Sequence, residues 1–322
     1  MSGTRAIPVA MLVFDGVRLL DLTGPLEVFD VATAMGTGHQ VTVCSPGGGD
    51  VTTSGGLRIG VQADAASLST VDTLVVPGGE CLVTERPDPA LQAAIAQLAP
   101  GARRVASVCA GAFALAEAGL LEGKRAATHW RHTGTLRRRF PTVTVDEESI
   151  YVRDGRVLTS AGVSAGIDLA LALVEEDAGD IVAHEIAKDL VVFMRRRGAQ
   201  PQLSVPARTA RPQRNPLRIL CDEIAADPGL NHSLPNLAAR AGLSERHLSR
   251  LFKAETGMTP TAYVHSVRRE AALALVDAGE TLGAAARRSG LGSEETLRRI
   301  LKANRLESAD GATGLIPVSR DH

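Results

Sequence analysis

The sequence predicts an α/β fold with a doubly wound, mostly parallel sheet, followed by an all-α double helix-turn-helix domain. Two observations support this division. Short apolar runs of strand length alternate with segments of helical spacing over residues 7–193, which is typical of βαβ units in a parallel sheet. Beyond residue 216 only helical patterns follow, and one of them occurs twice. A chain of 322 residues is long enough for two domains.

The elements of the first region follow from apolar periodicity. Short apolar runs predict strands at residues 7–14, 40–46, 73–79, 103–109, 124–130, 149–155 and 156–162. Apolar residues three or four apart predict helices at residues 21–35, 91–100, 110–121, 164–177 and 180–193. Right-handed crossovers would place these helices on both faces of the sheet.

A proline-rich segment separates the two regions. Residues 195–216 contain four prolines and no apolar periodicity, so we interpret them as a linker. The predicted boundaries are therefore a first domain at 5–194, the linker at 195–216, a second domain at 217–305 and a tail at 306–322.

The second region contains an internal repeat. LAARAGLSERHLSRLF (237–252) and GAAARRSGLGSEETLRRIL (283–301) each combine a helix rich in small residues, a turn with glycine and a serine placed to cap a second helix. The matching pairs are Gly242 and Gly290, Ser244 and Ser293, Leu248 and Leu297, and Arg250 and Arg299. This layout predicts two helix-turn-helix motifs, joined by a long amphipathic helix at 260–279.

Basic side chains on the second helix of each copy are the candidate DNA contacts. A single helix-turn-helix pattern is more often a simple structural helix pair, but two copies favour binding to double-stranded DNA. Arginine can read guanine with two hydrogen bonds, whereas lysine and serine suit phosphates. The first copy offers Arg246, His247, Ser249, Arg250 and Lys253, and the second offers Glu294, Glu295, Arg298, Arg299 and Lys302.

The distribution of charge supports an anionic partner for the second region. Residues 208–305 contain 16 basic and 10 acidic residues, whereas residues 1–205 contain 18 basic and 23 acidic residues. The whole chain is nearly neutral, so this asymmetry appears only when the two regions are compared.

Cysteine and histidine spacing gives no indication of a metal. The four cysteines are scattered along the chain at Cys44, Cys81, Cys109 and Cys221. His129 and His132 lie three residues apart without an evident third ligand, so neither a metal nor a cofactor is predicted. No signal peptide opens the sequence and no apolar run reaches the roughly 18 residues of a membrane helix. These features predict a cytoplasmic protein with reduced thiols and no membrane partner.

A cysteine stands at a predicted strand-to-helix elbow. The stretch SVCAGAFALA (107–116) places Cys109 directly after an apolar strand and before small residues that allow close helix–strand packing. Backbone N–H groups at the helix start favour its thiolate, whereas a charged Asp21 would disfavour it. Gly78 and Gly79 follow another strand and are candidates for an oxyanion hole.

The carboxyl ends of parallel strands meet at one edge of a sheet, where ligands bind. The predicted ligand pocket consists of Asp21, Gly78, Gly79, Cys109, Ala110, His129 and Trp130. If the pocket is catalytic, Cys109 is the nucleophile, Asp21 shares its proton and His129 is the base. The structural alternatives are a cysteine that fills the core, an aspartate that caps its helix and a tryptophan that only packs.

The second region resembles the AraC family of transcription regulators. The resemblance is carried by LAARAGLS (237–244) and by HLSRLFKAETGMTPTAYV (247–264), with Phe252, Gly257, Pro260 and Tyr263 in the family's places. It implies that the two recognition helices occupy successive major-groove segments on one face of DNA. The final stretch departs from the family, because Leu301 stands where phenylalanine is usual and no Gly-x-x-Pro-x-x-Tyr run follows.

The first region resembles the PfpI/ThiJ branch of the class I glutamine amidotransferase-like superfamily, which has a flavodoxin-like fold. The matching stretches are VFDGVRLLDLTGPLEVF (13–29), VVPGG (75–79), CAGAFALAEAGLLEGKRAATHW (109–130) and VLTSAGVSAGIDLALALV (157–174). Together with the AraC-type region, the chain is similar to GlxA-like regulators. The enzymes of the superfamily imply Cys109, Asp21 and His129 as active-site residues. Ala110 replaces the histidine of protease-like members, and Asp21 replaces the glutamate of several enzymes.

The sequence therefore predicts a transcription regulator rather than an enzyme. Its first domain is expected to sense a small molecule and to form a homodimer, and its second domain to bind DNA. Two alternatives stay open: an active Cys-dependent hydrolase or hydratase fused to a DNA-binding domain, and a redox sensor based on Cys109.

Overall fold

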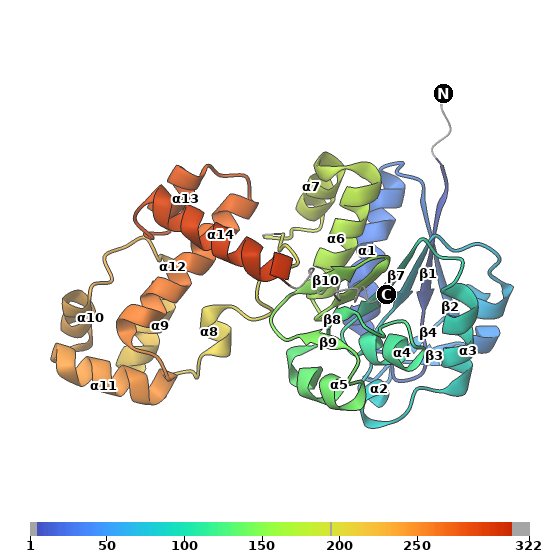
Figure 1. Ribbon diagram of the computed structural model, residues 1–322, viewed down its shortest axis with the longest axis horizontal. Coiled ribbons are helices and arrows are strands. Elements are labelled where there is room, and N and C mark those ends of the chain that lie inside the picture. Colours follow the sequence, from blue (N-terminus) through green and yellow to red (C-terminus); the bar gives the residue numbers. More distant parts are fainter. Residues whose placement is uncertain (1–4, 194, 311–322) are drawn as a thin grey trace, which may run out of the picture. The chain divides into compact units, whose positions relative to one another are not determined.

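The computed structural model describes residues 5–193 and 195–310, and the side chains of this part up to residue 302. The chain folds as two compact units, Met1–Gln202 and Leu203–His322. The first is an α/β unit and the second contains only helices in its described part (Figure 1).

The first unit is built on a seven-stranded sheet with the strand order β10-β11-β7-β6-β1-β2-β5. Every neighbouring pair is parallel except β10 and β11. The strands are β1 (Ile7–Leu12), β2 (His39–Ser45), β5 (Ala63–Asp64), β6 (Thr73–Val76), β7 (Arg104–Val108), β10 (Tyr151–Asp154) and β11 (Val157–Ser160). The predicted mostly parallel sheet is confirmed, and all residues of β6, β7 and β11 are buried, as apolar central strands require.

Two small sheets accompany the large one. An antiparallel pair joins β3 (Val51–Thr52) to β4 (Arg58–Ile59), and a parallel pair joins β8 (Arg125–Ala127) to β9 (Thr144–Asp146). The strand expected at 124–130 is therefore shorter than predicted, and it pairs outside the seven-stranded sheet. Its last residues form a short 3₁₀ helix, Trp130–His132, instead.

Helices cover the sheet on both sides (Figure 1). They are α1 (Leu19–Ala34), α2 (Cys81–Thr84), α3 (Pro89–Leu98), α4 (Gly111–Glu117), α5 (Thr133–Arg139), α6 (Ala165–Ala178) and α7 (Asp180–Asp189). α1, α6 and α7 contact one another, and α4 contacts α2 and α3. The helix expected at 180–193 ends at Asp189, and Val191 just beyond it has a positive φ of 53°, which α-helix does not accommodate.

The parallel arrangement determines where the candidate site lies. β1, β6 and β7 are neighbours in register, and the chain leaves them at Leu12, Val76 and Val108. The segments that follow these strands therefore meet at one edge of the sheet. Cys109 stands in one of these segments.

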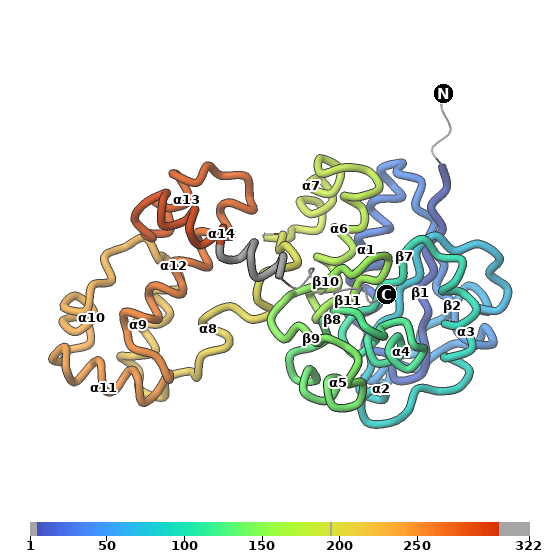
Figure 2. Tube along the Cα trace, in the orientation of Figure 1, coloured from blue at the N-terminus to red at the C-terminus, as the bar shows by residue number. Residues whose placement is uncertain are grey.

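The second unit consists of helices with two helix-turn-helix motifs, α10–α11 and α13–α14 (Figure 2). Its helices are α8 (Val205–Arg208), α9 (Asn215–Ala226), α10 (Leu234–Ala241), α11 (Glu245–Thr256), α12 (Pro260–Asp277), α13 (Leu282–Arg288) and α14 (Glu294–Asp310). Gly242 and Gly290 end the first helix of each motif with φ of 66° and 71°, a left-handed conformation that glycine adopts without a steric cost. The sequence after 310, which lacks the second Gly-Pro-Tyr run, lies outside the described residues.

The segment expected to be a linker divides between the two units. The backbone N–H of Ile150 donates to the Gln200 carbonyl at 2.9 Å, so the chain pairs with the first unit's antiparallel strand up to Gln202. Val205 is buried in the core of the second unit, and its N–H donates to Glu270 Oε2 at 2.8 Å. The interpretation of the segment as a linker rests on its lack of apolar periodicity. That criterion does not detect segments that are held by backbone hydrogen bonds.

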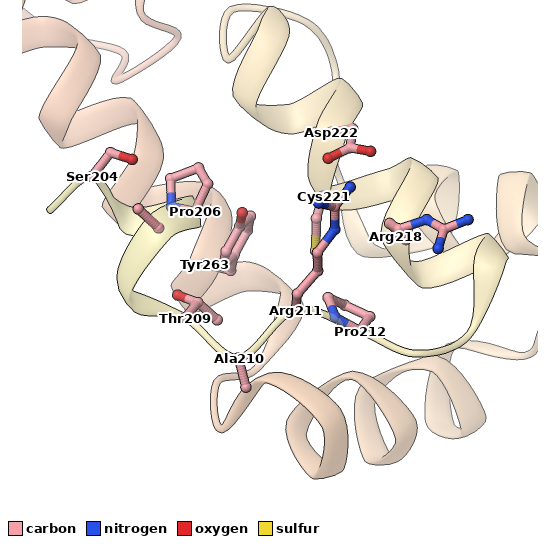
Figure 3. Close-up of a pocket in the computed structure, with 11 residues that line it drawn as sticks. Ser204, Pro206, Thr209, Ala210, Arg211, Pro212, Arg218, Cys221, Asp222 and Tyr263 are labelled. Atoms are coloured by element: carbon pink, nitrogen blue, oxygen red, sulfur yellow. The ribbon is translucent and has the colours of Figure 1, made fainter. Parts of the chain in front are cut away.

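Part of this segment roofs a cavity of about 280 Å³ in the second unit (Figure 3). Most residues from 204 to 212 line the cavity, together with residues of α9 and with Tyr263 of α12, which Figure 3 shows beside Pro206 and Thr209. Within the described residues, no helix combines the length and the apolar composition that crossing a membrane requires.

Candidate functional site

Cys109 occupies a strained elbow between β7 and α4. Its φ is 56°, a left-handed conformation that is rare for residues with a side chain. Two hydrogen bonds hold it there: its N–H donates to the Ser160 carbonyl at 3.0 Å, and its own carbonyl accepts from Thr128 Oγ1 at 2.8 Å. The predicted elbow is thus present, and neighbouring strands fix its backbone.

Glycines around the elbow allow the chain segments to approach closely. A Cβ on Gly111 would lie 2.2 Å from the Val76 carbonyl oxygen, and a Cβ on Gly162 would lie 2.1 Å from Cys109 Cβ. Both distances are far too short for real atoms, so side chains at these positions would displace the elbow. This packing explains the run of small residues after Cys109.

Asp21 lies beside the thiol and is fully buried in the first turn of α1. Its Oδ1 accepts from the N–H of Val163 at 2.7 Å, and Val163 has a positive φ of 53°. Its Oδ2 is buried without a hydrogen bond of good geometry in the described structure. A Cβ on Gly78 would lie 2.7 Å from this oxygen and 2.9 Å from Cys109 Cβ, so the carboxyl group and the thiol border the same small space. Asp21 therefore does not cap its helix, and the N-cap residue is Arg18.

Burial controls the protonation of this pair. Burial, and after it the Asp21 charge, raise the pKa of Cys109 to about 12, and the N–H of Ala110 and the Arg18 charge only partly oppose this shift. Burial also raises the pKa of Asp21, against hydrogen bonds from Val163 and Gly78. The thiol form therefore dominates at neutral pH, and the expected thiolate-favouring effect of the helix start is the weaker influence.

The hydrogen bond and ring contacts of His129 are with residues close to it in the chain and not with the thiol. Its Nδ1 accepts from the N–H of Arg131 at 3.3 Å, and its ring lies 5.6 Å from the Trp130 ring and 5.5 Å from the His132 ring. Burial, His132 and Arg18 lower the pKa of His129 to about 4, so the imidazole is neutral. Among the described residues no hydrogen bond joins His129 to Cys109. Trp130 is 46 % exposed, which is more than a residue that only packs in the core would show.

The two glycines of the predicted oxyanion hole face different neighbours. Gly78 borders Asp21, Cys109 and Ala110, as described above. A Cβ on Gly79 would instead meet the Gly16 carbonyl oxygen at 2.5 Å and the Phe14 ring at 3.2 Å. Phe14 lines a separate cavity of about 480 Å³. The structure thus brings together Asp21, Gly78, Cys109 and Ala110, and it turns Gly79 toward another part of the unit.

Sequence reasoning missed several contributors to this site. The positive charge of Arg18 affects the pKa values of Asp21, Cys109 and His129, so it lies within electrostatic reach of all three. Its place three residues before Asp21 was the available signal. Val163 donates a backbone hydrogen bond to Asp21, and the Thr128 hydroxyl donates one to the Cys109 carbonyl. Neither contact corresponds to a recognisable pattern in a single sequence. In residues 5–193 and 195–310, no three side chains of the metal-binding types form a cluster that could hold an ion.

The candidate DNA-reading surface lies on the second helix of each motif. In α11, Ser244 caps the helix by accepting from the N–H of His247 at 3.3 Å, and Arg246 and Arg250 are exposed. In α14, Ser293 accepts from the N–H of Thr296 at 3.2 Å, and Arg299 is exposed. The predicted contacts that are exposed are Arg246, His247, Arg250, Lys253, Glu295, Arg298, Arg299 and Lys302, whereas Ser249 and Glu294 are half-buried.

These features define an α/β unit with a strained strand-to-helix elbow, followed in the chain by a pair of helix-turn-helix motifs. Residues 8–176 match the DJ-1/PfpI family and residues 237–308 match a helix-turn-helix domain. The first match covers more than half of the chain, and the chain therefore belongs to the DJ-1/PfpI family. The combination predicted from the sequence is confirmed.

Several proteins are similar to this chain over much of their length. The transcriptional regulator GlxA of Rhizobium meliloti is 30 % identical over 225 residues, which cover 68 % of this chain and 67 % of that protein. The isonitrile hydratase of Pseudomonas putida is 36 % identical over 175 residues, covering 54 % of this chain and 73 % of the enzyme. The crystal structure of an AraC family transcriptional regulator from Pseudomonas putida aligns with a TM-score of 0.51 at 25 % identity, covering 57 % of this chain and 99 % of that one.

Proposed function

We propose that the protein is a sequence-specific DNA-binding transcription regulator that acts in the cytoplasm. The observation that carries the proposal is the pair of capped helices, α11 and α14, each with exposed arginines, in one helical unit. Relatives that span both units, including GlxA, are named as transcriptional regulators. Arginines on a helix that fits the major groove supply both phosphate and base contacts.

The test is selection of bound DNA from a random pool by the full chain. We expect one enriched sequence with two half-sites and affinity that falls steeply with salt, because cationic contacts to phosphates release counterions. The control is the double variant Arg246→Ala, Arg250→Ala, which should enrich no sequence. If the unmodified protein also enriches none, the proposal is wrong.

We further propose that the cleft around Cys109 binds a small-molecule effector. The proposed pocket combines the buried pair Asp21 and Cys109 with Gly78, Ala110, His129 and Trp130. Gly79, which the sequence also suggested, is left out of it because it faces Gly16 and Phe14. Support comes from Asp21 Oδ2, which is buried near Cys109 without a hydrogen-bond partner among the described residues, and from the exposed Trp130 ring. Genes beside the selected sites would indicate candidate effectors. We expect Asp21→Asn and Cys109→Ala to abolish the effect of the true effector on DNA affinity, while Cys44→Ala, a buried control in β2, preserves it.

The first unit is also the proposed site of homodimer formation. Apolar side chains on and after α7 are strongly exposed, in particular Ile181, Val191 and Phe193. Exposed apolar side chains of this size favour burial against a second copy of the chain. Light scattering should give twice the chain mass of 33.7 kDa, and Ile181→Glu should reduce it to one. An unchanged mass for this variant would place the interface elsewhere.

A second candidate function is Cys-dependent hydration. It is favoured by the adjacent Asp21 and Cys109 and by the similarity to an isonitrile hydratase. In such a reaction water adds to the terminal carbon of an isonitrile to give an N-substituted formamide. Incubation with an alkyl isonitrile should yield this formamide with the unmodified protein and with Cys81→Ala, but not with Cys109→Ala. Absence of the formamide in all three would favour the regulator without catalysis.

The redox-sensor alternative receives less support. Cys109 is 3 % exposed and its pKa is raised, and both features slow oxidation, which needs an accessible thiolate. Peroxide treatment should therefore leave DNA affinity unchanged.

A further inference from the structure

The two helix-turn-helix motifs have separate apolar cores. The first core includes Leu248, Phe252 and Tyr263, and the second is formed mainly by Ala272, Ala285, Ala286 and Leu297. α12 takes part in both cores and is the covalent connection between the motifs. A single helix can bend or rotate relative to what it carries, so a further contact is needed to fix one motif against the other.

Arg268, near the middle of α12, makes such a contact. Its Nε donates to the Pro228 carbonyl at 2.9 Å, and its Nη2 donates to the Leu230 carbonyl at 2.8 Å. Both carbonyls belong to the loop that leads from α9 into α10 of the first motif. The planar guanidinium suits two acceptors at once, a geometry that an ammonium group does not provide.

The same loop is itself held in shape. The N–H of Gly229 donates to Asp227 Oδ1 at 3.1 Å, and His232, which is buried, bonds the Asp227 carbonyl through Nε2 at 2.8 Å. The carbonyls that Arg268 binds are therefore fixed in direction. Because the two acceptor carbonyls are held in place, the hydrogen bonds of Arg268 connect α12 rigidly to this loop.

The loop also lies directly against the turn of the second motif. A Cβ on Gly290, in the turn between α13 and α14, would lie 2.8 Å from the Pro228 carbonyl oxygen and 2.9 Å from Arg268 Nε. A Cβ on Gly229 would lie 2.6 Å from the Arg288 carbonyl oxygen. The backbones of the two motifs thus meet at Arg268 with no room for a side chain at either glycine.

We propose that Arg268 is a positioning residue that fixes the angle between the two recognition helices and thereby sets the half-site spacing the protein accepts. The proposal rests on DNA binding through both motifs. Each added base pair moves a half-site by about 3.4 Å and rotates it by about 34° around the DNA axis. A rigid pair of motifs cannot follow that change, whereas a pair joined only by α12 can.

The experiment measures the affinity of the full chain for its selected operator and for versions with one base pair inserted or removed between the half-sites. We expect the unmodified protein to lose on the order of tenfold in affinity when the spacing changes, as for a misplaced contact. Arg268→Ala should bind the native spacing more weakly and discriminate among the three spacings less than threefold. Arg268→Lys should be intermediate, because it keeps the charge but loses the two-carbonyl fork.

His265→Ala is the matched control, since His265 is exposed on the same helix and has no hydrogen bond or ion pair in the described part of the chain. It should keep the spacing profile of the unmodified protein. A melting curve for each variant separates loss of the fold from loss of rigidity. The inference is overturned if Arg268→Lys, with an unchanged melting temperature, keeps the full spacing discrimination. If the unmodified protein binds no operator at all, the proposed function fails first and independently.

Discussion

The two helix-turn-helix motifs share the same arrangement of helices but differ in the side chains that form their apolar cores. Each has a serine-capped second helix, and each of these helices has a fully buried leucine, Leu248 in the first motif and Leu297 in the second. The first leucine packs in a core with Phe252 and Tyr263, whose rings lie 5.5 Å apart. The second packs with buried alanines and with leucine and valine side chains that are only partly buried. The repeated sequence pattern therefore gives both motifs the same arrangement of helices, but their apolar cores differ in composition.

The motifs also differ in how available their arginines are. In α14, Arg298 donates to Glu294 Oε1 at 2.6 Å, one turn away. In α11, neither Arg246 nor Arg250 has an ion pair within the described residues. The arginines of the first recognition helix are therefore not paired with an acidic side chain of the described residues, whereas Arg298 of the second is paired with Glu294. This contrast supports a division of labour in which the first motif reads bases and the second adds backbone affinity.

The largest expected effect is on stability. Phe252→Ala should destabilise the second unit by about 3–5 kcal/mol, because it leaves a cavity beside Tyr263. Leu297→Ala should cost near the lower end of the roughly 2–5 kcal/mol typical of leucine, because the larger apolar side chains of its core are only partly buried. Calorimetry of the full chain would measure how far each substitution lowers the unfolding transition of the second unit. Equal losses would mean that the cores are equally tight.

The next effect is on sequence reading. Arg250→Ala should cost roughly 1–3 kcal/mol at the operator and relax the preference at one base position. Arg299→Ala should weaken binding to all sequences evenly and reduce the salt slope by about one unit. Titration of operator and scrambled DNA across a salt series measures both. Loss of discrimination in Arg299→Ala alone would reverse the assigned roles.

The smallest effect comes from the ion pair in α14. Glu294→Gln should release Arg298 and remove a charge that opposes phosphate at the helix start, which raises affinity by about 0.3–1 kcal/mol. Glu245→Gln is the matched change in α11, where no arginine partner is released. It should therefore raise affinity less. A larger gain from Glu245→Gln would show that the Arg298 pair does not limit binding.

Periodicity alone was enough for much of the fold. Alternation of strands and helices predicted the parallel sheet, and the repeat predicted both helix-turn-helix motifs with the correct capping serines. The elbow at Cys109 was also predictable, because an apolar run followed by small residues requires a tight turn. Elements with little periodicity were missed, including α8 in the expected linker and the short strands β3, β4 and β5.

The sequence by itself determined the class of protein, since local patterns of apolar, capping and turn residues specify elements and their order. Only the tertiary structure decided the protonation and the contacts of the residues around Cys109. Burial, which no local pattern reports, raises the pKa of Cys109 to about 12 and outweighs the helix start. It also decided that His129 contacts its own neighbours in the chain, that Gly79 faces Gly16 and Phe14, and that Arg268 reaches the carbonyls of a distant loop. These outcomes depend on which segments meet in space, and contacts between residues far apart in the chain leave no trace in the spacing of a single sequence.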